Sequence, residues 1–187
     1  IIARKGIEAA IELVNRMGSK GIKLVISHQA RDEGKEYYDR IMDYARLLEV
    51  DLIVRPDIIG EIRETGPEGA KIYSLFDVYP HADFVTYPST YEGFGNAFLE
   101  AVFFRKPLVI KRYSIFVTDI EPKGFEIIPV DIFPTSDVLE QVRRVINDAD
   151  YRTKMVNHNY ELAKTFFSYS VLRRKLRALL ANVTGYG

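Results

Sequence analysis

Hydrophobic positions along the chain alternate between two spacings, and that alternation predicts the order of its elements. Over residues 6–17, apolar side chains recur every three or four positions, which is the period of one helix face. A short apolar run at 22–27 predicts a strand, a second helical pattern follows over 33–48, and another apolar run lies at 51–55. Strands that alternate with helices in this way lie parallel and are joined by crossover connections. The pattern therefore predicts an α/β fold, a Rossmann-like parallel sheet with helices on both faces.

The same alternation continues to residue 131, and only helical patterns remain beyond it. We expect a short helix over 70–79, a buried strand within 82–89, and further strands at 108–111 and 126–129. Helical patterns then follow at 138–146, 151–166 and 169–180. The stretch 112–125 carries no clear pattern, and we expect a surface loop there. The chain is thus predicted to be a single domain, residues 1–187, with a helical C-terminal tail.

Composition limits the kinds of partner that the chain can have. Its 26 basic and 26 acidic residues give a formal net charge of zero, so no overall field attracts nucleic acid or an anionic membrane surface. The chain has no cysteine, which excludes disulfides and thiolate catalysis, and no pattern of histidines or carboxylates argues for a bound metal. No signal-like segment or apolar run long enough to span a bilayer is present, and we expect a cytoplasmic protein.

The segment 91–100 carries the most specific chemistry in the chain. It reads Tyr-Glu-Gly-Phe-Gly-Asn-Ala-Phe-Leu-Glu and places Glu92 and Glu100 eight positions apart around two glycines. Because Gly93 and Gly95 lack a Cβ, they allow positive φ and let a ligand approach backbone N–H groups. Those groups open a predicted helix whose first turn favours a diphosphate, while Glu100 can accept hydrogen bonds from sugar or ribose hydroxyls.

A simpler interpretation is that the glycines only make a turn and that both glutamates are solvated. The flanks favour a binding site, because the segment lies between a predicted strand and a predicted helix. Ligands of open parallel sheets bind at that place, beyond the carboxyl ends of the strands. His28 and Arg55 also follow predicted strand ends, although an ordinary loop residue is the simpler interpretation for each.

Residues 91–100 resemble the Glu-x7-Glu signature of retaining GT-B glycosyltransferases, in the family of sucrose-phosphate synthases and bacterial mannosyl- and glucosyltransferases (glycosyltransferase family four). The resemblance extends to Tyr-Pro-Ser before the segment, to Arg-Lys-Pro-Leu-Val-Ile after it, and to Arg-Lys-Gly-Ile-Glu near the start of the chain. It covers most of residues 4–130. It implies the C-terminal, donor-binding, Rossmann-like domain of such an enzyme, which is one half of a GT-B fold.

The resemblance also implies roles for individual residues. Glu92 and Lys5 match catalytic positions: Glu92 would position hydroxyls of the transferred sugar without acting as a covalent nucleophile, and Lys5 would stabilise the departing diphosphate. The donor-binding positions are Gly93, Phe94, Gly95 and Asn96, through backbone N–H groups, and Glu100, through the ribose.

Two departures from the family pattern are visible. The family pairs the lysine with an arginine several residues earlier, which the chain does not contain, and we expect the neighbouring Arg4 to point elsewhere. A glycine-rich donor loop of the family is replaced by Arg112-Tyr113-Ser114, and we expect these to be surface residues.

At the level of the whole protein, the resemblance implies a hexosyltransferase that uses a nucleotide-diphosphate sugar, retains the anomeric configuration and needs no metal or other cofactor. Its partners would be the nucleotide sugar and an amino-terminal GT-B domain with the acceptor site. We expect the chain to be a fragment that lacks this domain and its own first strand, and to be inactive alone. Phe166 and Phe167 are expected to pack on their own domain. Two alternatives remain, a noncatalytic nucleotide-binding or interaction domain and a GT-B nucleotide-sugar epimerase.

Overall fold

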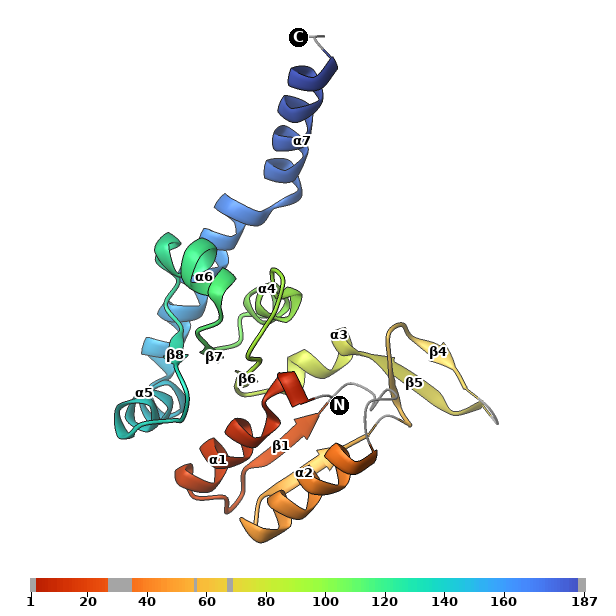
Figure 1. The fold of residues 1–187 in the computed structure, drawn as a ribbon, viewed down its shortest axis with the longest axis vertical. Helices are drawn as coiled ribbons and strands as arrows, with labels where there is room; N and C mark the ends of the chain where they lie inside the picture. The colour runs from red at the N-terminus through yellow and green to blue at the C-terminus, as the bar shows by residue number, and fades with distance from the viewer. Residues whose placement is uncertain (1–2, 27–34, 56, 67–68, 185–187) are drawn as a thin grey trace.

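Parallel strands with helices packed against them make up the body of the molecule (Figure 1). The computed structural model describes residues 3–26, 35–55, 57–66 and 69–184, so His28 lies outside the described residues. The α-helices are α1 (Ile7–Met17), α2 (Lys35–Leu47), α3 (Leu75–Val78), α4 (Asn96–Phe103), α5 (Ser136–Asn147), α6 (Ala149–Phe167) and α7 (Tyr169–Thr184). The strands are β1 (Lys23–Ile26), β2 (Asp51–Val54), β3 (Ile59–Gly60), β4 (Glu64–Thr65), β5 (Lys71–Ser74), β6 (Val85–Tyr87), β7 (Leu108–Lys111) and β8 (Ile128–Val130).

Two of the sheets are entirely parallel. β1 pairs with β2, and β6, β7 and β8 follow one another in that order. β7 is the central strand of the second sheet, and its Leu108, Val109 and Ile110 are all buried, as expected for a strand covered on both faces. The predicted α/β fold is therefore confirmed.

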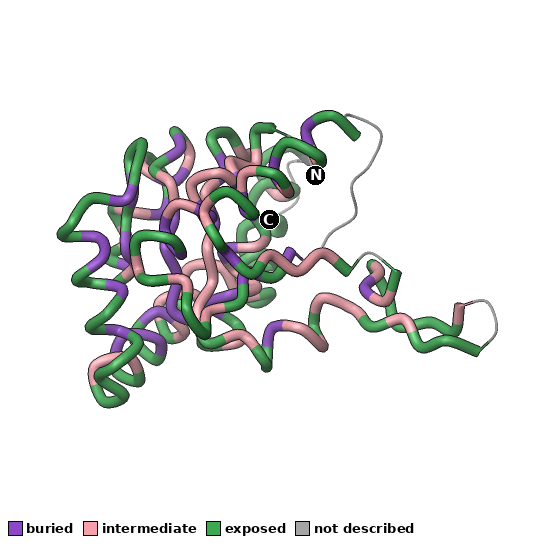
Figure 2. The backbone as a smooth tube through the Cα atoms, turned by 90° about the horizontal axis from the view of Figure 1, so that it is seen from below, coloured by how far each residue is buried: buried purple, intermediate pink, exposed green. Residues whose placement is uncertain are grey.

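Helix α1 packs against both parallel sheets. Its Ile11 is fully buried in a core that includes Ile41 of α2 and residues of β1. Its Leu13 is buried in another core, with Val109 of β7 and residues of α5. Figure 2 shows the buried stretches gathered in this body of the molecule. The start of α1 is consequently held at a fixed place relative to β6 and β7.

A third, mixed sheet was not predicted. β5 lies between β3 and β4, parallel to β3 and antiparallel to β4, and this sheet forms an arm that projects from the body in Figure 2. The predicted helix over 70–79 is wrong in its first half, because residues 71–74 form β5. This stretch alternates in exposure along its length and contains Ile72 and Tyr73, residue types that favour strands. Helical structure begins only at α3, where the Asp77 carboxylate accepts a hydrogen bond from the Ser74 N–H at 2.9 Å.

The predicted surface loop at 112–125 is also wrong for its central residues. A π-helical turn, Phe116–Ile120, and a 3-10 turn, Glu121–Lys123, fill most of this stretch. Tyr113, Phe116 and Ile120 are buried in the same core as α4 and β7. Because Phe116 and Ile120 are four positions apart, the helical turn places both on the face that meets this core.

The predicted helical tail is confirmed, and α7 extends away from the body (Figure 1). Phe167, at the end of α6, packs on Phe94 and Phe125 with ring centroids 5.1 and 6.0 Å apart. The ring of Phe166 lies beside Lys123, whose Nζ is 5.8 Å from the ring centroid. Both aromatic residues thus contact their own domain, as expected. Within the described part of the chain, no helix combines the length and the apolar character needed to cross a membrane.

Candidate functional site

The glycine segment, residues 91–100, follows β6 and runs into the first turns of α4, at the carboxyl end of a parallel strand. Gly95 directly precedes α4 and has a φ of 89°. A Cβ built at Gly95 would lie 2.5 Å from the Tyr113 hydroxyl oxygen and 3.0 Å from that of Tyr87. Both the backbone conformation and the space therefore require glycine at this position. Gly93 differs, since its φ is not in the left-handed region and a Cβ there would meet open space.

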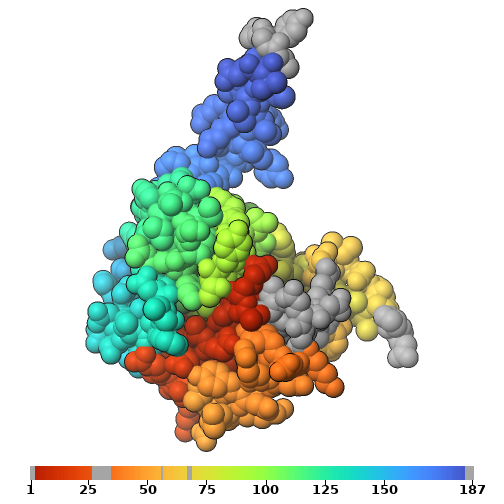
Figure 3. Space-filling model, in the orientation of Figure 1, coloured from red at the N-terminus to blue at the C-terminus, as the bar shows by residue number. Residues whose placement is uncertain are grey.

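The amino-terminal turn of the chain lies against this segment. The Arg4 carbonyl accepts hydrogen bonds from the Thr90 N–H at 2.8 Å and from the Thr90 hydroxyl at 3.1 Å. A Cβ at Gly6, whose φ is 62°, would lie 2.5 Å from the Pro88 carbonyl oxygen, so the two segments approach as closely as backbone allows. Figure 3 shows the red amino-terminal residues in contact with the yellow-green segment around residue 90.

This approach brings the two predicted catalytic residues together. Lys5 Nζ lies 2.5 Å from Glu92 Oε1, although the residues are 87 positions apart in the sequence. Arg4 was expected to point elsewhere, and this prediction is wrong. Its Nη1 lies 3.4 Å from the same carboxylate oxygen and donates to the Tyr91 carbonyl at 3.1 Å. Two cations thus face one carboxylate, which leaves a local excess of positive charge.

The electrostatics of the site follow from this cluster. Burial acts to raise the pKa of Glu92, but the hydrogen bond and charge of Lys5, together with the charge of Arg4, outweigh it and lower that pKa below its ordinary value. Burial and the Glu92 charge raise the pKa of Tyr113 to about 12. The same two causes raise the pKa of Tyr87. At neutral pH the carboxylate is ionised and both tyrosine hydroxyls keep their protons.

Two tyrosines donate hydrogen bonds to the glycine segment, and the sequence analysis predicted neither contact. The Tyr113 hydroxyl donates to the Phe94 carbonyl at 3.0 Å, and Tyr113 is buried, so its predicted place on the surface is wrong. The Tyr79 hydroxyl donates to Glu100 Oε2 at 3.0 Å. A signal for Tyr113 was present, because it comes two positions after the end of β7, next to the strand that leads into the segment.

The remaining predicted residues occupy the first turn of α4 and its approach. Asn96 is exposed as the first residue of the helix, and Glu100 is half-buried one turn further along. Phe94 is half-buried and packs on Phe167. Lys5 Nζ lies 5.9 Å from the centre of the Tyr87 ring, and Gly95 at the start of α4 approaches the same ring. The partial positive charge of the helix amino terminus is therefore near the Lys5–Glu92 pair. In the described residues, no group of three or more histidines, cysteines or carboxylates is arranged to hold a metal ion.

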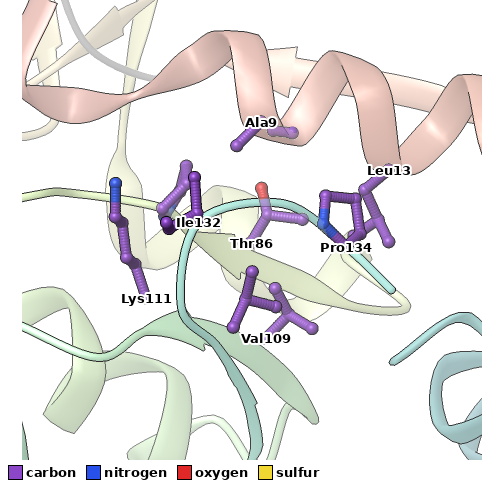
Figure 4. Close-up of a pocket in the computed structure, with 10 residues that line it drawn as sticks. Ala9, Leu13, Thr86, Val109, Lys111, Ile132 and Pro134 are labelled. Atoms are coloured by element: carbon purple, nitrogen blue, oxygen red, sulfur yellow. The ribbon is translucent and has the colours of Figure 1, made fainter. Parts of the chain in front are cut away.

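A small cavity lies apart from this segment, between α1 and the sheet of β6, β7 and β8. Figure 4 shows Ala9 and Leu13 of α1 facing Thr86 and Val109 of the sheet. The other lining residues are Ala10, Pro88, Lys111, Val130, Ile132 and Pro134. None of the predicted catalytic or donor-binding residues lines this mostly apolar cavity, so it is not the candidate site.

Comparisons with known proteins give the class to which this fold belongs. The chain resembles the C-terminal domain of a glycosyl transferase group 1 family protein from Francisella tularensis, with a TM-score of 0.68 and 18% identity, covering 90% of this chain and 83% of the other. It also resembles HepE from Anabaena, solved in complex with UDP, with a TM-score of 0.76 and 13% identity over 97% of this chain and 46% of HepE. The chain has the fold of a C-terminal GT-B glycosyltransferase domain, as the sequence predicted.

Proteins similar to the chain in sequence have a more specific enzyme name than its structural neighbours. A mannosylglucosylglycerate synthase from Petrotoga mobilis is 35% identical over 146 residues, which cover 68% of this chain. The matched part is 33% of that synthase, so the chain spans about a third of the relative's length. No protein-family model matches the chain.

Proposed function

We propose that this chain is the donor-binding domain of a retaining glycosyltransferase that transfers a hexose from a nucleotide-diphosphate sugar to an acceptor. The observation that carries the proposal is the cluster of Arg4, Lys5 and Glu92 beside the amino terminus of α4. Two cations and a helix dipole form a site for a diphosphate, and the half-buried Glu100 supplies an acceptor for hydroxyls. The likeness to a synthase named for a glycosidic product and to a UDP complex supports the same function.

In this proposal the site acts mainly on the leaving group. Breaking the glycosidic bond leaves negative charge on the diphosphate, and Lys5 with the first turn of α4 would stabilise that charge without a metal ion. Glu92 would exchange its contact with Lys5 for hydrogen bonds to the sugar hydroxyls once the diphosphate takes over the lysine. The backbone N–H groups of residues 93–96 would line the diphosphate and the sugar.

Two further parts of the protein, a strand and a second domain, would complete the site. Among the described strands, β1 pairs only with β2 and β6 pairs only with β7, so each has one edge without a partner strand. We propose that a further parallel strand lies between these edges in the full protein, and that a second GT-B domain carries the acceptor site. The chain alone would then bind the donor without transferring the sugar.

Transfer by the longer protein that contains this chain tests the proposal. With UDP-glucose or GDP-mannose as donor, an acceptor that carries a free hydroxyl, and EDTA present, we expect a glycoside of the acceptor with the same anomeric configuration as the donor, read by proton NMR, and release of the nucleoside diphosphate. The 187-residue chain should give no product under the same conditions. An inverted anomer would contradict the retaining mechanism, a requirement for metal would contradict the metal-independent site, and epimerised or hydrolysed nucleotide sugar would favour the epimerase alternative.

A further inference from the structure

We propose that Tyr79 is a positioning residue that fixes the Glu100 carboxylate for the ribose hydroxyls of the nucleotide. This inference rests on the proposed function, because it assigns a role to a residue outside the glycine segment at the same site. Tyr79 begins a 3-10 turn, Tyr79–His81, that leads into β6, whereas Glu100 lies 21 positions later on α4.

The Tyr79 side chain is held in one place by its neighbours. Its ring stacks on Phe104 with the centroids 5.1 Å apart and the planes at 8°, and only 9% of the residue is exposed. Its hydroxyl oxygen lies 3.0 Å from Glu100 Oε2, and 3.4 Å from the Ala97 carbonyl oxygen one turn earlier on the same helix. A buried ring that is stacked in this way cannot swing aside, so the hydroxyl is a fixed point against which the carboxylate is oriented.

The protonation states suit this role. Burial, followed by the charge and hydrogen bond of Glu100, raises the pKa of the Tyr79 hydroxyl. The phenol therefore keeps its proton at neutral pH and donates it to the carboxylate. Donation to Oε2 leaves the lone pairs of Oε1 for a ligand, and a carboxylate can accept several hydrogen bonds at once. The two neighbouring hydroxyls of a ribose can both donate to the Glu100 carboxylate, whose orientation Tyr79 has already fixed.

The buried Tyr79 hydroxyl orients the Glu100 side chain before a ligand binds. Glu100 lies on the half-exposed face of α4, where an unsupported glutamate side chain would sample several rotamers. Each hydrogen bond to a ligand would then include the cost of ordering that side chain. The fixed Tyr79 hydroxyl removes part of this cost before the ligand binds.

The test compares Tyr79→Phe with the unchanged chain by calorimetric titration with UDP, GDP and ADP, and with the 2′,3′-dideoxy form of the nucleotide that binds. Phenylalanine keeps the stacking on Phe104 and removes only the hydroxyl. We expect Tyr79→Phe to weaken binding of the ribonucleotide about fivefold to tenfold, the order of a lost hydrogen bond at an ionised group. Binding of the dideoxy nucleotide should change less than about twofold, within the range of surface substitutions without a specific role.

Matched variants separate positioning from a general structural effect. Tyr44→Phe is the control, because the Tyr44 hydroxyl also donates to a carboxylate, that of Glu12. This pair lies beside the core formed by α1, α2 and β1, and not at the candidate site. Tyr44→Phe should leave both affinities unchanged. If Tyr79 acts through Glu100, adding Tyr79→Phe to Glu100→Ala should cause no further loss of ribonucleotide binding.

The other possible results distinguish the role of Tyr79 from the proposed function. Equal ribonucleotide binding by Tyr79→Phe and the unchanged chain would overturn the role of Tyr79, and so would an equal loss for the ribonucleotide and its dideoxy form. Failure of the unchanged, folded chain to bind any of the three nucleotides would instead overturn the proposed function, and this inference with it. If Tyr79→Phe does not fold, Phe104→Leu takes its place, because it removes the stacking partner of the Tyr79 ring and keeps the Tyr79 hydroxyl. Phe104→Leu should weaken binding of the ribonucleotide only. An equal loss for the ribonucleotide and its dideoxy form, or no loss for either, would overturn the inference.

Discussion

At the scale of single residues, the proposed function implies that Glu92 and the diphosphate would compete for the same lysine. The side chain of Glu92 is only 12% exposed, and its Oε1 lies 2.5 Å from Lys5 Nζ. The pKa of Glu92 is lowered, because the hydrogen bond and charge of Lys5 and the charge of Arg4 outweigh the effect of burial, so the carboxylate is ionised at neutral pH. A nucleoside diphosphate without a sugar would have to displace this carboxylate from Lys5 and would gain no hydrogen bond from it in return.

Glu92→Gln should therefore bind a bare nucleoside diphosphate more tightly, by about threefold, which is the scale of a partly exposed ion pair. The same substitution should weaken binding of the sugar nucleotide, because the glutamine at this position cannot accept hydrogen bonds from the sugar hydroxyls as an ionised group. Calorimetric titration of both ligands measures the two changes. Glu12→Gln is the control, since Glu12 contacts Tyr44 and none of the site residues. Weaker binding of the bare diphosphate would contradict the competition.

At the scale of elements, the connection between β6 and α4 depends on one of its two glycines. Gly95→Ala should lower the free energy of unfolding by about 1–3 kcal/mol, because it combines a left-handed φ with a Cβ 2.5 Å from the Tyr113 hydroxyl. Gly93→Ala is the matched control, and its effect should stay within about 0.5 kcal/mol. Denaturant unfolding gives both values, and similar losses for the two variants would show that the segment is not held in this conformation.

The arm of β3, β4 and β5 is anchored to α3 by the Arg63–Asp77 ion pair, in which Arg63 Nε lies 2.8 Å from one Asp77 oxygen. The hydrogen bond from Arg63, followed by that of the Ser74 N–H, lowers the pKa of Asp77 below its ordinary 3.8. The ionised form is therefore favoured by folding, and its contribution to stability is present above that ordinary value and lost as the pH falls below it.

Arg63→Ala should accordingly speed amide exchange in β5 at neutral pH, where the ion pair is intact in the unchanged chain. Hydrogen exchange followed by mass spectrometry gives this rate. Arg55→Ala removes a comparable exposed pair, with Asp57, and should leave β5 unaffected. Unchanged exchange in β5 after Arg63→Ala would mean that the strand pairing alone holds the arm.

The elements that the sequence predicted well are those with a clear period or a fully apolar run. Helix α1 and strand β7 meet these conditions, because their buried positions repeat along the chain. β5 was missed because two of its four residues are exposed and the other two are only half-buried, so no apolar run marks it. The residues of the candidate site came from the resemblance, and their roles stay predictions. The contacts of Tyr79, Tyr113 and Arg4 with the glycine segment were not predicted, because each joins residues distant in the sequence.

At the scale of the whole molecule, the body and the last helix are separable. None of the described side chains of α7 is buried, and Leu176 and Leu179 on it are 49% and 60% exposed. A chain that ends after Ser168 should therefore keep the melting temperature of the full chain within about 2 °C, since exposed residues add little to stability. Calorimetric melting measures this difference.

A shorter chain that ends after Tyr160 is the comparison for this truncation. It removes Leu162 and Phe167, which pack against the core around α4 and β7. We expect a loss of about 3 kcal/mol or more, as for deletion of a large buried side chain, and a clearly lower melting temperature. Similar melting temperatures for both truncated chains would show that α6 does not stabilise the core.

The central claim is that residues 4–5, 92–96 and 100 form a metal-independent site for a nucleoside diphosphate. The most direct measurement is calorimetric titration of the 187-residue chain with UDP, GDP and ADP in the presence of EDTA. The account predicts saturable binding of one of these nucleotides, weakened about tenfold by Lys5→Ala as a charged contact is lost. No binding of any of them by the folded chain, or binding that Lys5→Ala leaves unchanged, would contradict it.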